Sequence, residues 1–488
     1  MSHILIDAAC VLAIATLFVF DRGEKARTSA GLWITVAWLL IAGSRSVSMW
    51  IWGAAPVMSA DRYLEGNPID RAVLGTLTGV GIVILMRRAG TVSRVLRANA
   101  PIVCFFLYCA LSVFWSEFPE VAFKRWIRGV GDFVMILIIL TEAKPWTAIR
   151  RVLAWTSFVL LPLSVVLIRY YPDLGRQYSR DWELMYTGVT TQKNELGVIC
   201  AILGLASVWR LLWDYRNAVG RIRLRRMLVH GFLAGTAVCL LWIANSVTAS
   251  SCFVMGTLVM LFLSLPKIRS SSFVVQTVVG LTVLIPFAIL FLNMSGDTIA
   301  SLGRNSTLTG RTQVWERALE LITHPICGSG YESFWLGQRL ATMSEVQPGI
   351  NQAHNGYLEI FLNLGWCGIA LLAILIASGY RNVIAAFRLH QDGGLLKIAL
   401  FAVAISYNFT EAGFKMMNPM WIAFLWATTR TPRVATVPSR TGRTAAALRE
   451  NASDSPYALE WNSCFRPRND GNGKPGEVTS RADPLQTV

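Results

Sequence analysis

The strongest constraint on this chain is a series of apolar segments, each about as long as a bilayer is thick. A helix needs ~20 apolar residues to cross a hydrocarbon core of ~30 Å, and such segments recur between residues 4 and 430. Of the 488 residues 54% are hydrophobic and 15% are charged, whereas soluble domains carry about 25% charged residues. The sequence therefore predicts an all-α, polytopic helical membrane protein.

The basic residues predict its orientation. The chain has 45 Lys and Arg against 29 Asp and Glu, a surplus that also occurs in nucleic-acid-binding proteins. Here the cations cluster in alternate short loops, which is the positive-inside pattern of cytoplasmic loops. We therefore expect membrane lipid, and no nucleic acid, as a partner. The clusters are Arg22, Lys25 and Arg27; Arg87, Arg88, Arg94 and Arg97; Lys144, Arg150 and Arg151; and Arg216, Arg221, Arg223, Arg225 and Arg226.

This orientation gives thirteen spans with the N-terminus outside, or twelve if the first segment or the short pair near residues 245–251 is not a span. No small-residue cleavage site follows residues 4–20, so we interpret that segment as a span rather than a signal peptide. The predicted spans lie near 4–20, 31–52, 70–86, 101–116, 126–142, 152–170, 191–213, 229–245, 250–266, 273–293, 354–378, 396–411 and 417–430.

Four regions follow from these spans. Residues 1–293 form the N-terminal transmembrane helices, 294–353 a long periplasmic loop, and 354–430 the C-terminal transmembrane helices. Residues 431–488 are polar and lack apolar periodicity, which predicts a disordered cytoplasmic tail. The nine cysteines show neither a disulfide framework nor metal-ligand spacing, so we expect no metal and no cofactor.

The long loop contains an amphipathic helical pattern from Thr309 to Leu321. Its apolar face comprises Val314, Trp315, Ala318, Leu319 and Ile322. Such a helix would lie on the membrane surface or cap the bundle. Arg311 falls in the first predicted turn, where the helix dipole disfavours a cation. A bound anion would explain it, assisted by the free N–H groups of that turn, and a solvated surface arginine is the alternative.

His354 lies where the long loop re-enters the membrane. A histidine can act as a general base near neutral pH, and the alternative is that it only anchors the start of a helix. Other polar residues fall on the same outer side, and a cationic site there suits a phosphate or diphosphate lipid head group. For each residue alone a structural ion pair is the alternative, and Asp70 or Asp61 could pair with Arg45. These candidates are Arg45, Arg176, Arg180, Lys193 and Asn194.

Several motifs are similar to those of a known family. His354-Asn355, followed after nine residues by Gly365-Trp366-Cys367-Gly368, resembles the H-N-x9-G-x-x-G pattern of the O-antigen ligase and Wzy polymerase superfamily. Further similar elements, some of them resembling the ExoQ-like exopolysaccharide polymerase branch, extend the resemblance over residues 30–430. They are Thr309-Gly310-Arg311 with Trp315, Gly328-Ser329-Gly330-Tyr331, Lys193-Asn194-Glu195-Leu196-Gly197, Gly43-Ser44-Arg45, Trp115-Ser116, Asn408 and Thr410-Glu411.

The resemblance implies a metal-independent, inverting glycosyl transfer at the periplasmic face of the bacterial inner membrane. The donor would be a glycan on undecaprenyl diphosphate, and the acceptor a hydroxyl of another glycan. Arg311 would bind the leaving diphosphate, and His354 would orient or deprotonate the acceptor. The family also uses an arginine in an earlier outer loop, for which Arg176 and Arg180 are the candidates, and Lys193 is a candidate to share that role. The further residues expected to contact the substrate are Lys193, Asn194, Arg45 and Asn355.

The ExoQ-like elements favour a polymerase. A ligase that transfers a lipid-linked glycan to another acceptor, a lipid-linked glycan transporter and a noncatalytic scaffold are the alternatives. A polymerase would act with chain-length regulator and export proteins as partners.

Overall fold

The described part of the chain is almost entirely helical. Its only strands form a short antiparallel hairpin, in which β1 (Arg176–Tyr178) pairs with β2 (Leu184–Tyr186). The prediction of an all-α protein is confirmed. The computed structural model describes residues 3–22, 28–53, 66–178, 182–291 and 307–431.

Six of the described helices are long and apolar enough to cross a membrane, which makes this a multi-pass membrane protein. They are α1 (His3–Phe20), α5 (Pro68–Met86), α9 (Pro145–Tyr170), α11 (Lys193–Asn217), α12 (Gly220–Ala244) and α19 (Gly356–Leu389).

Other helices complete the bundle. Further helices of the bundle are α2 (Leu32–Ala42), α8 (Pro119–Leu140), α13 (Val247–Leu263), α15 (Ser272–Phe291), α20 (Gln391–Tyr407) and α21 (Pro419–Thr428). α6 (Ala89–Ala98) and α7 (Ala100–Leu111), the latter extended by η1 (Ser112–Trp115), form a pair bent by 91°. Every predicted span overlaps a helix, while the total of twelve or thirteen spans stays a prediction. Small connecting helices are α3 (Val47–Trp52), α10 (Pro172–Gly175) and α14 (Pro266–Arg269).

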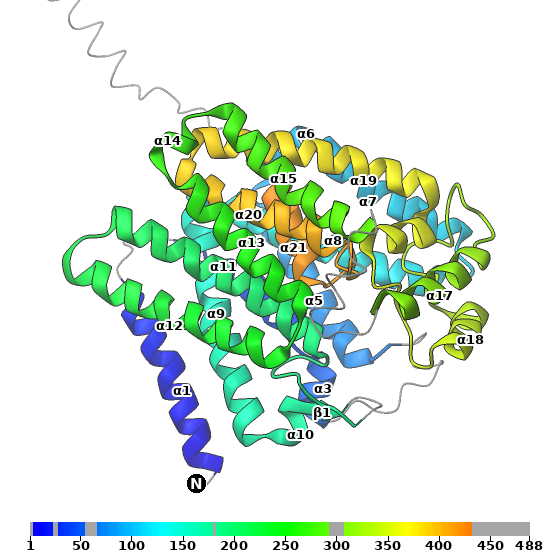
Figure 1. Cartoon of the computed structure of the whole chain (residues 1–488), viewed down its shortest axis with the longest axis horizontal. Helices are drawn as coiled ribbons and strands as arrows, with labels where there is room; N and C mark the ends of the chain where they lie inside the picture. The colour runs from blue at the N-terminus through cyan, green and yellow to red at the C-terminus, as the bar shows by residue number, and fades with distance from the viewer. Residues whose placement is uncertain (1–2, 23–27, 54–65, 179–181, 292–306, 432–488) are drawn as a thin grey trace, which may run out of the picture. The chain divides into compact units, whose positions relative to one another are not determined.

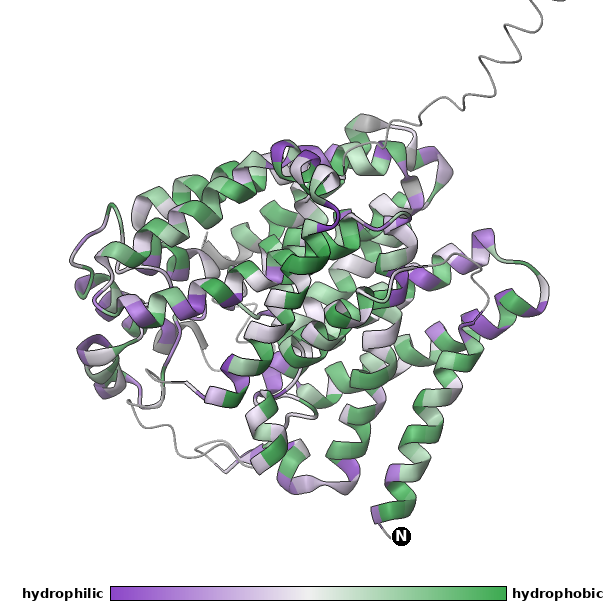
Figure 2. Ribbon diagram, turned by 180° about the vertical axis from the view of Figure 1, so that it is seen from behind, coloured by the Kyte–Doolittle hydropathy of each residue, from purple (hydrophilic) through white to green (hydrophobic). Residues whose placement is uncertain are grey.

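The most buried helices are α20 and α21. They pack against each other and against α8, α11, α13, α15 and α19 (Figure 1). Figure 2 shows hydrophobic residues along the lengths of the helices and hydrophilic residues gathered at helix ends and connections. This distribution fits a bilayer, because helices satisfy their own backbone hydrogen bonds and can therefore expose apolar side chains to lipid.

The predicted span at residues 31–52 is broken. Residues 31–52 form two helices, because α2 ends at Ala42 and α3 begins at Val47. In the break between them the backbone N–H of Arg45 donates to the carbonyl of Val189, at 3.0 Å. The proposed Arg45–Asp70 pair is not formed, because Asp70 instead accepts hydrogen bonds from the backbone N–H and the hydroxyl of Ser48, at 2.8 and 2.6 Å. The alternative partner, Asp61, lies outside the described residues.

The long loop has a hydrophobic core of its own. Its helices α17 (Thr307–Glu320) and α18 (Gly337–Val346) pack together, and Val314 and Ala318 of α17 are buried as predicted. Leu319 was also expected on this face, but it is 47% exposed. Residues 294–306 of the predicted loop and 432–488 of the predicted tail lie outside the described residues. The buried members of the loop core are Val314, Ala318, Phe334, Trp335, Met343, Ile350, Ala353 and Leu362.

A break inside α19 attaches this loop to the bundle. At Gly365 the backbone adopts φ 65° and ψ −163°, and a Cβ there would overlap the carbonyl of Ile326. The break frees backbone groups for the loop. Trp366 and Cys367 donate to the loop carbonyls of residues 325 and 326, at 2.9 and 3.1 Å, while loop residues 329 and 330 donate to α19 carbonyls, at 3.1 and 2.9 Å. Glycine is therefore required at 365 by backbone geometry.

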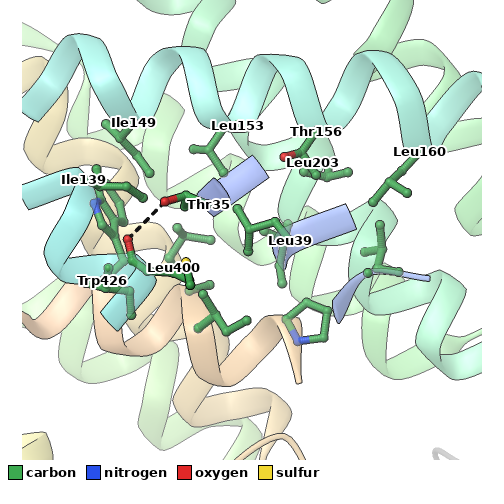
Figure 3. Close-up of a pocket in the computed structure, with 18 residues that line it drawn as sticks. Thr35, Leu39, Ile139, Ile149, Leu153, Thr156, Leu160, Leu203, Leu400 and Trp426 are labelled. Atoms are coloured by element: carbon green, nitrogen blue, oxygen red, sulfur yellow. Dashed lines mark hydrogen bonds between the residues drawn. The ribbon is translucent and has the colours of Figure 1, made fainter. Parts of the chain in front are cut away.

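A small apolar cavity lies in the centre of the bundle (Figure 3). Side chains such as Leu39, Leu153, Leu160 and Leu203 line it, and the Thr35 hydroxyl is turned to the carbonyl of Met135, at 3.5 Å. Its volume of about 60 Å³ is less than half that of engineered cavities of ~150 Å³ that bind benzene.

Candidate functional site

Glu411 joins three segments that are far apart in the sequence. It lies in the turn after α20 and is only 5% exposed. Its Oε1 accepts hydrogen bonds from Nη2 of Arg311, at 3.3 Å, and from Nδ2 of Asn194, at 3.1 Å. Its Oε2 lies 3.2 Å from Nδ1 of His354. Three residues predicted from the sequence thus meet at one buried carboxylate.

Asn408 holds this turn against the start of α19. Its side-chain oxygen accepts hydrogen bonds from the backbone N–H groups of Gly413 and Phe414, both at 2.8 Å. Its carbonyl accepts from the N–H of Gly356, at 2.9 Å. A Cβ on Gly356 would overlap the Asn408 side chain. The close approach that brings Glu411 to His354 therefore needs a glycine directly after His354-Asn355.

The conformation of His354 is fixed from both sides. Its φ of 50° lies in the left-handed region, which is uncommon for a residue other than glycine and needs support from its surroundings. On one side, the indole N–H of Trp315 donates to the carbonyl of Ala353, at 2.8 Å. On the other, the Asn355 side chain accepts from the first two free N–H groups of α19, both at 3.0 Å, and donates to the carbonyl of Phe409, at 3.2 Å.

Arg311 is held by the same turn, but not from the first turn of its helix. α17 already includes Thr307, so Arg311 is its fifth residue and the predicted conflict with the helix dipole does not arise. Nη1 donates to the carbonyl of Thr410, and Nη2 bonds to Glu411. A guanidinium carries five N–H donors, and the side chain is 26% exposed. Donors are thus left for an anion.

The start of α11 presents Asn194 to the site. Glu195 accepts hydrogen bonds from the backbone N–H and the hydroxyl of Thr191, at 3.2 and 2.7 Å. These bonds hold the residues that lead into α11 against its first turn. Lys193 precedes Asn194 and is half-buried, but within the described part of the chain no contact joins it to Glu411.

The two remaining described candidates lie on the hairpin side. Arg45 is 5% exposed, donates to the carbonyl of Leu174 and lies over the ring of Trp50, at 5.6 Å. Arg176 donates to the carbonyl of Ile168, at 2.9 Å. Both arginines tie the hairpin region to the bundle, and their binding roles stay predictions. Arg180 lies outside the described residues.

Comparison with known proteins shows what the chain is similar to. Residues 232–373 match the family model described as O-antigen ligase, a stretch that contains Arg311 and His354. Over 325 residues the chain is 25% identical to the exopolysaccharide production protein ExoQ of Rhizobium meliloti (strain 1021). These aligned residues cover 62% of this chain and 69% of that protein. The chain is O-antigen ligase-like and ExoQ-like. The resemblance predicted from the motifs is confirmed.

In this O-antigen ligase-like chain, two carboxylates near His354 were not among the predicted site residues. Glu411 lies beyond the matched stretch, and its only sequence signal was the Thr410-Glu411 element. Glu359 is buried one turn into α19, where it accepts from the indole N–H of Trp335, at 2.9 Å, and from the backbone N–H of Ala353. Glu359 therefore positions the residue that directly precedes His354.

Proposed function

We propose that this chain polymerises undecaprenyl-diphosphate-linked oligosaccharide repeat units into an exopolysaccharide or O-antigen-type polysaccharide. The reaction would take place at the periplasmic face of the bacterial inner membrane. The observation that carries the proposal is the meeting of Arg311 and His354 at the buried carboxylate of Glu411. The name of the ExoQ relative, an exopolysaccharide production protein, supports this class of product.

The proposed step forms one glycosidic bond. The acceptor hydroxyl oxygen attacks the anomeric carbon of the donor, and the bond from that carbon to the diphosphate oxygen breaks. Attack opposite the leaving group inverts the anomeric configuration. Because an ionised carboxylate only accepts hydrogen bonds, we assign the ring proton of His354 to Nδ1, 3.2 Å from Glu411 Oε2, which leaves Nε2 as the base that takes the hydroxyl proton. The carboxylate then stabilises the resulting imidazolium, as in hydrolase triads.

Arg311 would stabilise the departing diphosphate. Catalysis needs charge stabilisation where negative charge develops, and a guanidinium binds phosphate oxygens through two parallel hydrogen bonds. Two of the five donors of Arg311 are used by the turn that carries Glu411. In this proposal cationic side chains neutralise the leaving group, and no metal ion takes part.

The lipid tail of the substrate is proposed to stay in the bilayer. The apolar cavity of Figure 3 holds only about 60 Å³, which is too small for a polyprenyl chain. Many apolar side chains on the helices are exposed, including Val83, Leu107 and Ile374. The tail can therefore lie against the outer surface of the helices while the diphosphate reaches Arg311.

The test supplies full-length protein in lipid nanodiscs with a lipid-diphosphate oligosaccharide and follows product length. We expect a ladder of products from the native protein and none from Arg311→Ala or His354→Ala. Arg317→Ala is the matched control, because Arg317 lies on the same helix and pairs with the exposed Glu320.

Each other outcome contradicts part of the proposal. Full-length polymer from both site variants would overturn the mechanism. A single transfer to an acceptor would identify a ligase, the activity named in the description of the matching family. Movement of the lipid-linked glycan across the membrane without chemical change would identify a transporter.

A further inference from the structure

Two cysteines lie beside the break in α19. Cys327 belongs to the long loop, and Cys367 is the second residue after Gly365. They are 40 positions apart in the sequence, so no local motif joins them. Both are free thiols in the structure, and each is half-buried. They are therefore more accessible to a reagent than the fully buried cysteines of the bundle.

A backbone hydrogen bond brings these two cysteines to the distance that a disulfide needs. The N–H of Cys367 donates to the carbonyl of Ile326, the residue before Cys327, at 3.1 Å. Because only this bond, one peptide unit and one N–Cα bond separate them, the Cα atoms of Cys327 and Cys367 lie within about 7 Å of each other. Disulfides usually join residues whose Cα atoms are ~4.4–6.8 Å apart. A disulfide can therefore form here with little movement of the backbone.

Tyr108 of α7 shows that the two thiols point to the same place. Its hydroxyl interacts with the thiols of both Cys327 and Cys367, and it donates to the carbonyl of Leu364, at 3.1 Å. The ring of Trp115 lies 5.8 Å from that of Tyr108, and its indole N–H donates to the carbonyl of Cys327, at 3.3 Å. The loop backbone and both thiols are thus held together against α7 and η1.

The position of the pair indicates its redox environment. Trp115 and Trp366, which flank the pair, are 38% and 61% exposed, and tryptophan favours the boundary between lipid and water. The pair lies on the side of the long loop, which the proposed function places in the periplasm. Disulfides form and persist in the bacterial periplasm, whereas they are rare in the cytosol.

We propose that Cys327 and Cys367 form a disulfide that ties the long loop to α19. The proposal rests on the periplasmic location of the loop in the proposed function. The thiolate of one cysteine attacks a disulfide of a periplasmic oxidant protein and forms a mixed disulfide. The second thiolate attacks the cysteine sulfur of that mixed disulfide and releases the oxidant as a dithiol. The two cysteines lose two electrons and two protons, which the oxidant protein takes up.

This disulfide keeps the two halves of the candidate site together. Four backbone hydrogen bonds join loop residues 325–330 to α19, and local openings of native structure break such bonds transiently. The loop segment follows α17, which carries Arg311, and α19 begins directly after His354-Asn355. With the disulfide formed, the loop cannot move far from α19 while the hydrogen bonds are open.

The test marks the oxidised cysteines of the full-length protein made in bacteria with an oxidising periplasm. Free thiols are blocked with one maleimide during denaturation, disulfides are then reduced, and the released thiols receive an isotopically heavy maleimide. Peptide mass spectrometry should find the heavy label on at least about nine-tenths of Cys327 and Cys367, because structural disulfides resist reduction by cellular thiols. Cys327→Ser should return Cys367 to the first label. The matched variant Cys104→Ser, which changes an exposed cysteine of α7, should leave the pattern unchanged.

A second measurement separates the disulfide from the location of the loop. Glu320→Cys adds an exposed thiol to α17, which a membrane-impermeant maleimide should label in spheroplasts. If it is labelled while native Cys327 and Cys367 carry the first label, the disulfide alone is rejected. If it is not labelled, the periplasmic location is rejected, and the disulfide with it. Heavy label on Cys367 in the Cys327→Ser variant would also overturn the proposal, because it would show a different partner.

Discussion

Replacing Glu411 with glutamine changes one oxygen of the site into an NH2 group and keeps the shape of the side chain. The Oε1 position receives two donors, Nδ2 of Asn194 and Nη2 of Arg311. The amide oxygen must occupy that position, because an NH2 group there would face two other donors. The new NH2 group then faces Nδ1 of His354, which lies 3.2 Å from the present Oε2. Nδ1 would become an acceptor, and the ring proton would move to Nε2.

A His354 protonated at Nε2 cannot take the proton of the acceptor hydroxyl. The comparable exchange of amide for carboxylate in a serine-protease triad lowers kcat about 10⁴-fold, and general-base catalysis contributes about 10²–10⁴-fold. We expect Glu411→Gln to lower the initial rate of glycosyl transfer by about 10²–10⁴-fold. At 1.36 kcal/mol per factor of ten, this is a loss of about 3–5 kcal/mol of transition-state stabilisation.

The assay compares initial rates of full-length variants in nanodiscs at saturating lipid-diphosphate donor. Glu411→Asp keeps a carboxylate for Nδ1 and should lose less activity than the glutamine variant. Glu320→Gln makes the same chemical change in an exposed ion pair on α17 and should leave the rate unchanged. A folded Glu411→Gln protein that keeps more than about a tenth of the native rate would refute the assigned tautomer, since general-base catalysis is worth at least about 10²-fold.

The other predictions concern stability. Asn355→Ala removes the N-cap of α19 and should lower the free energy of unfolding by about 1–2 kcal/mol. Asn355→Ser can still cap the helix and should lower this free energy much less. Equal unfolding midpoints for the native and alanine proteins would contradict this prediction. Gly365→Ala places a Cβ against the carbonyl of Ile326 and should detach the loop, seen as faster limited proteolysis between α17 and α18. Burial raises the pKa of Asp21, but the hydrogen bond to His230 and the neighbouring arginines outweigh it, so the pKa lies below its ordinary value. Asp21 therefore adds stability above its unfolded pKa of about 3.9, which is lost as the pH falls further. Asp21→Asn should flatten the decline in thermal midpoint between about pH 5 and 3, and an unchanged decline would contradict the assignment.

The helices could be predicted from hydropathy because a bilayer leaves the backbone few alternatives to helix. The break within residues 31–52 could not, since hydropathy averages over a window and Gly43–Ser46 contains only one charge. The break depends on the N–H of Arg45 donating to Val189, a residue 144 positions away in the sequence. No local pattern encodes such a contact.

The same limit applies to the site. His354 could be predicted because it lies where the long loop re-enters the membrane, and Arg311 because it lies in the predicted amphipathic helix of that loop. The register of Arg311 could not, because nothing in Thr307-Leu308 prevents a helix from starting earlier. Glu411 was missed because its partners lie 57, 100 and 217 residues away. The residues next to Glu411 in the sequence do not indicate that the fold brings three hydrogen-bond donors to its carboxylate.

The motif around His354 combines two physical requirements that the sequence alone does not separate. Gly356 allows the close approach of Asn408 and so brings the Glu411 turn to His354. Gly365 allows the break in α19 that binds the loop backbone at residues 325 and 326, and that loop continues from the helix of Arg311. Gly356 and Gly365 thus position Arg311 and His354 relative to each other. If substituting Gly356 or Gly365 lowers activity, the cause is misplacement of Arg311 and His354. If substituting Glu411 with glutamine lowers activity, the cause is the changed protonation of His354.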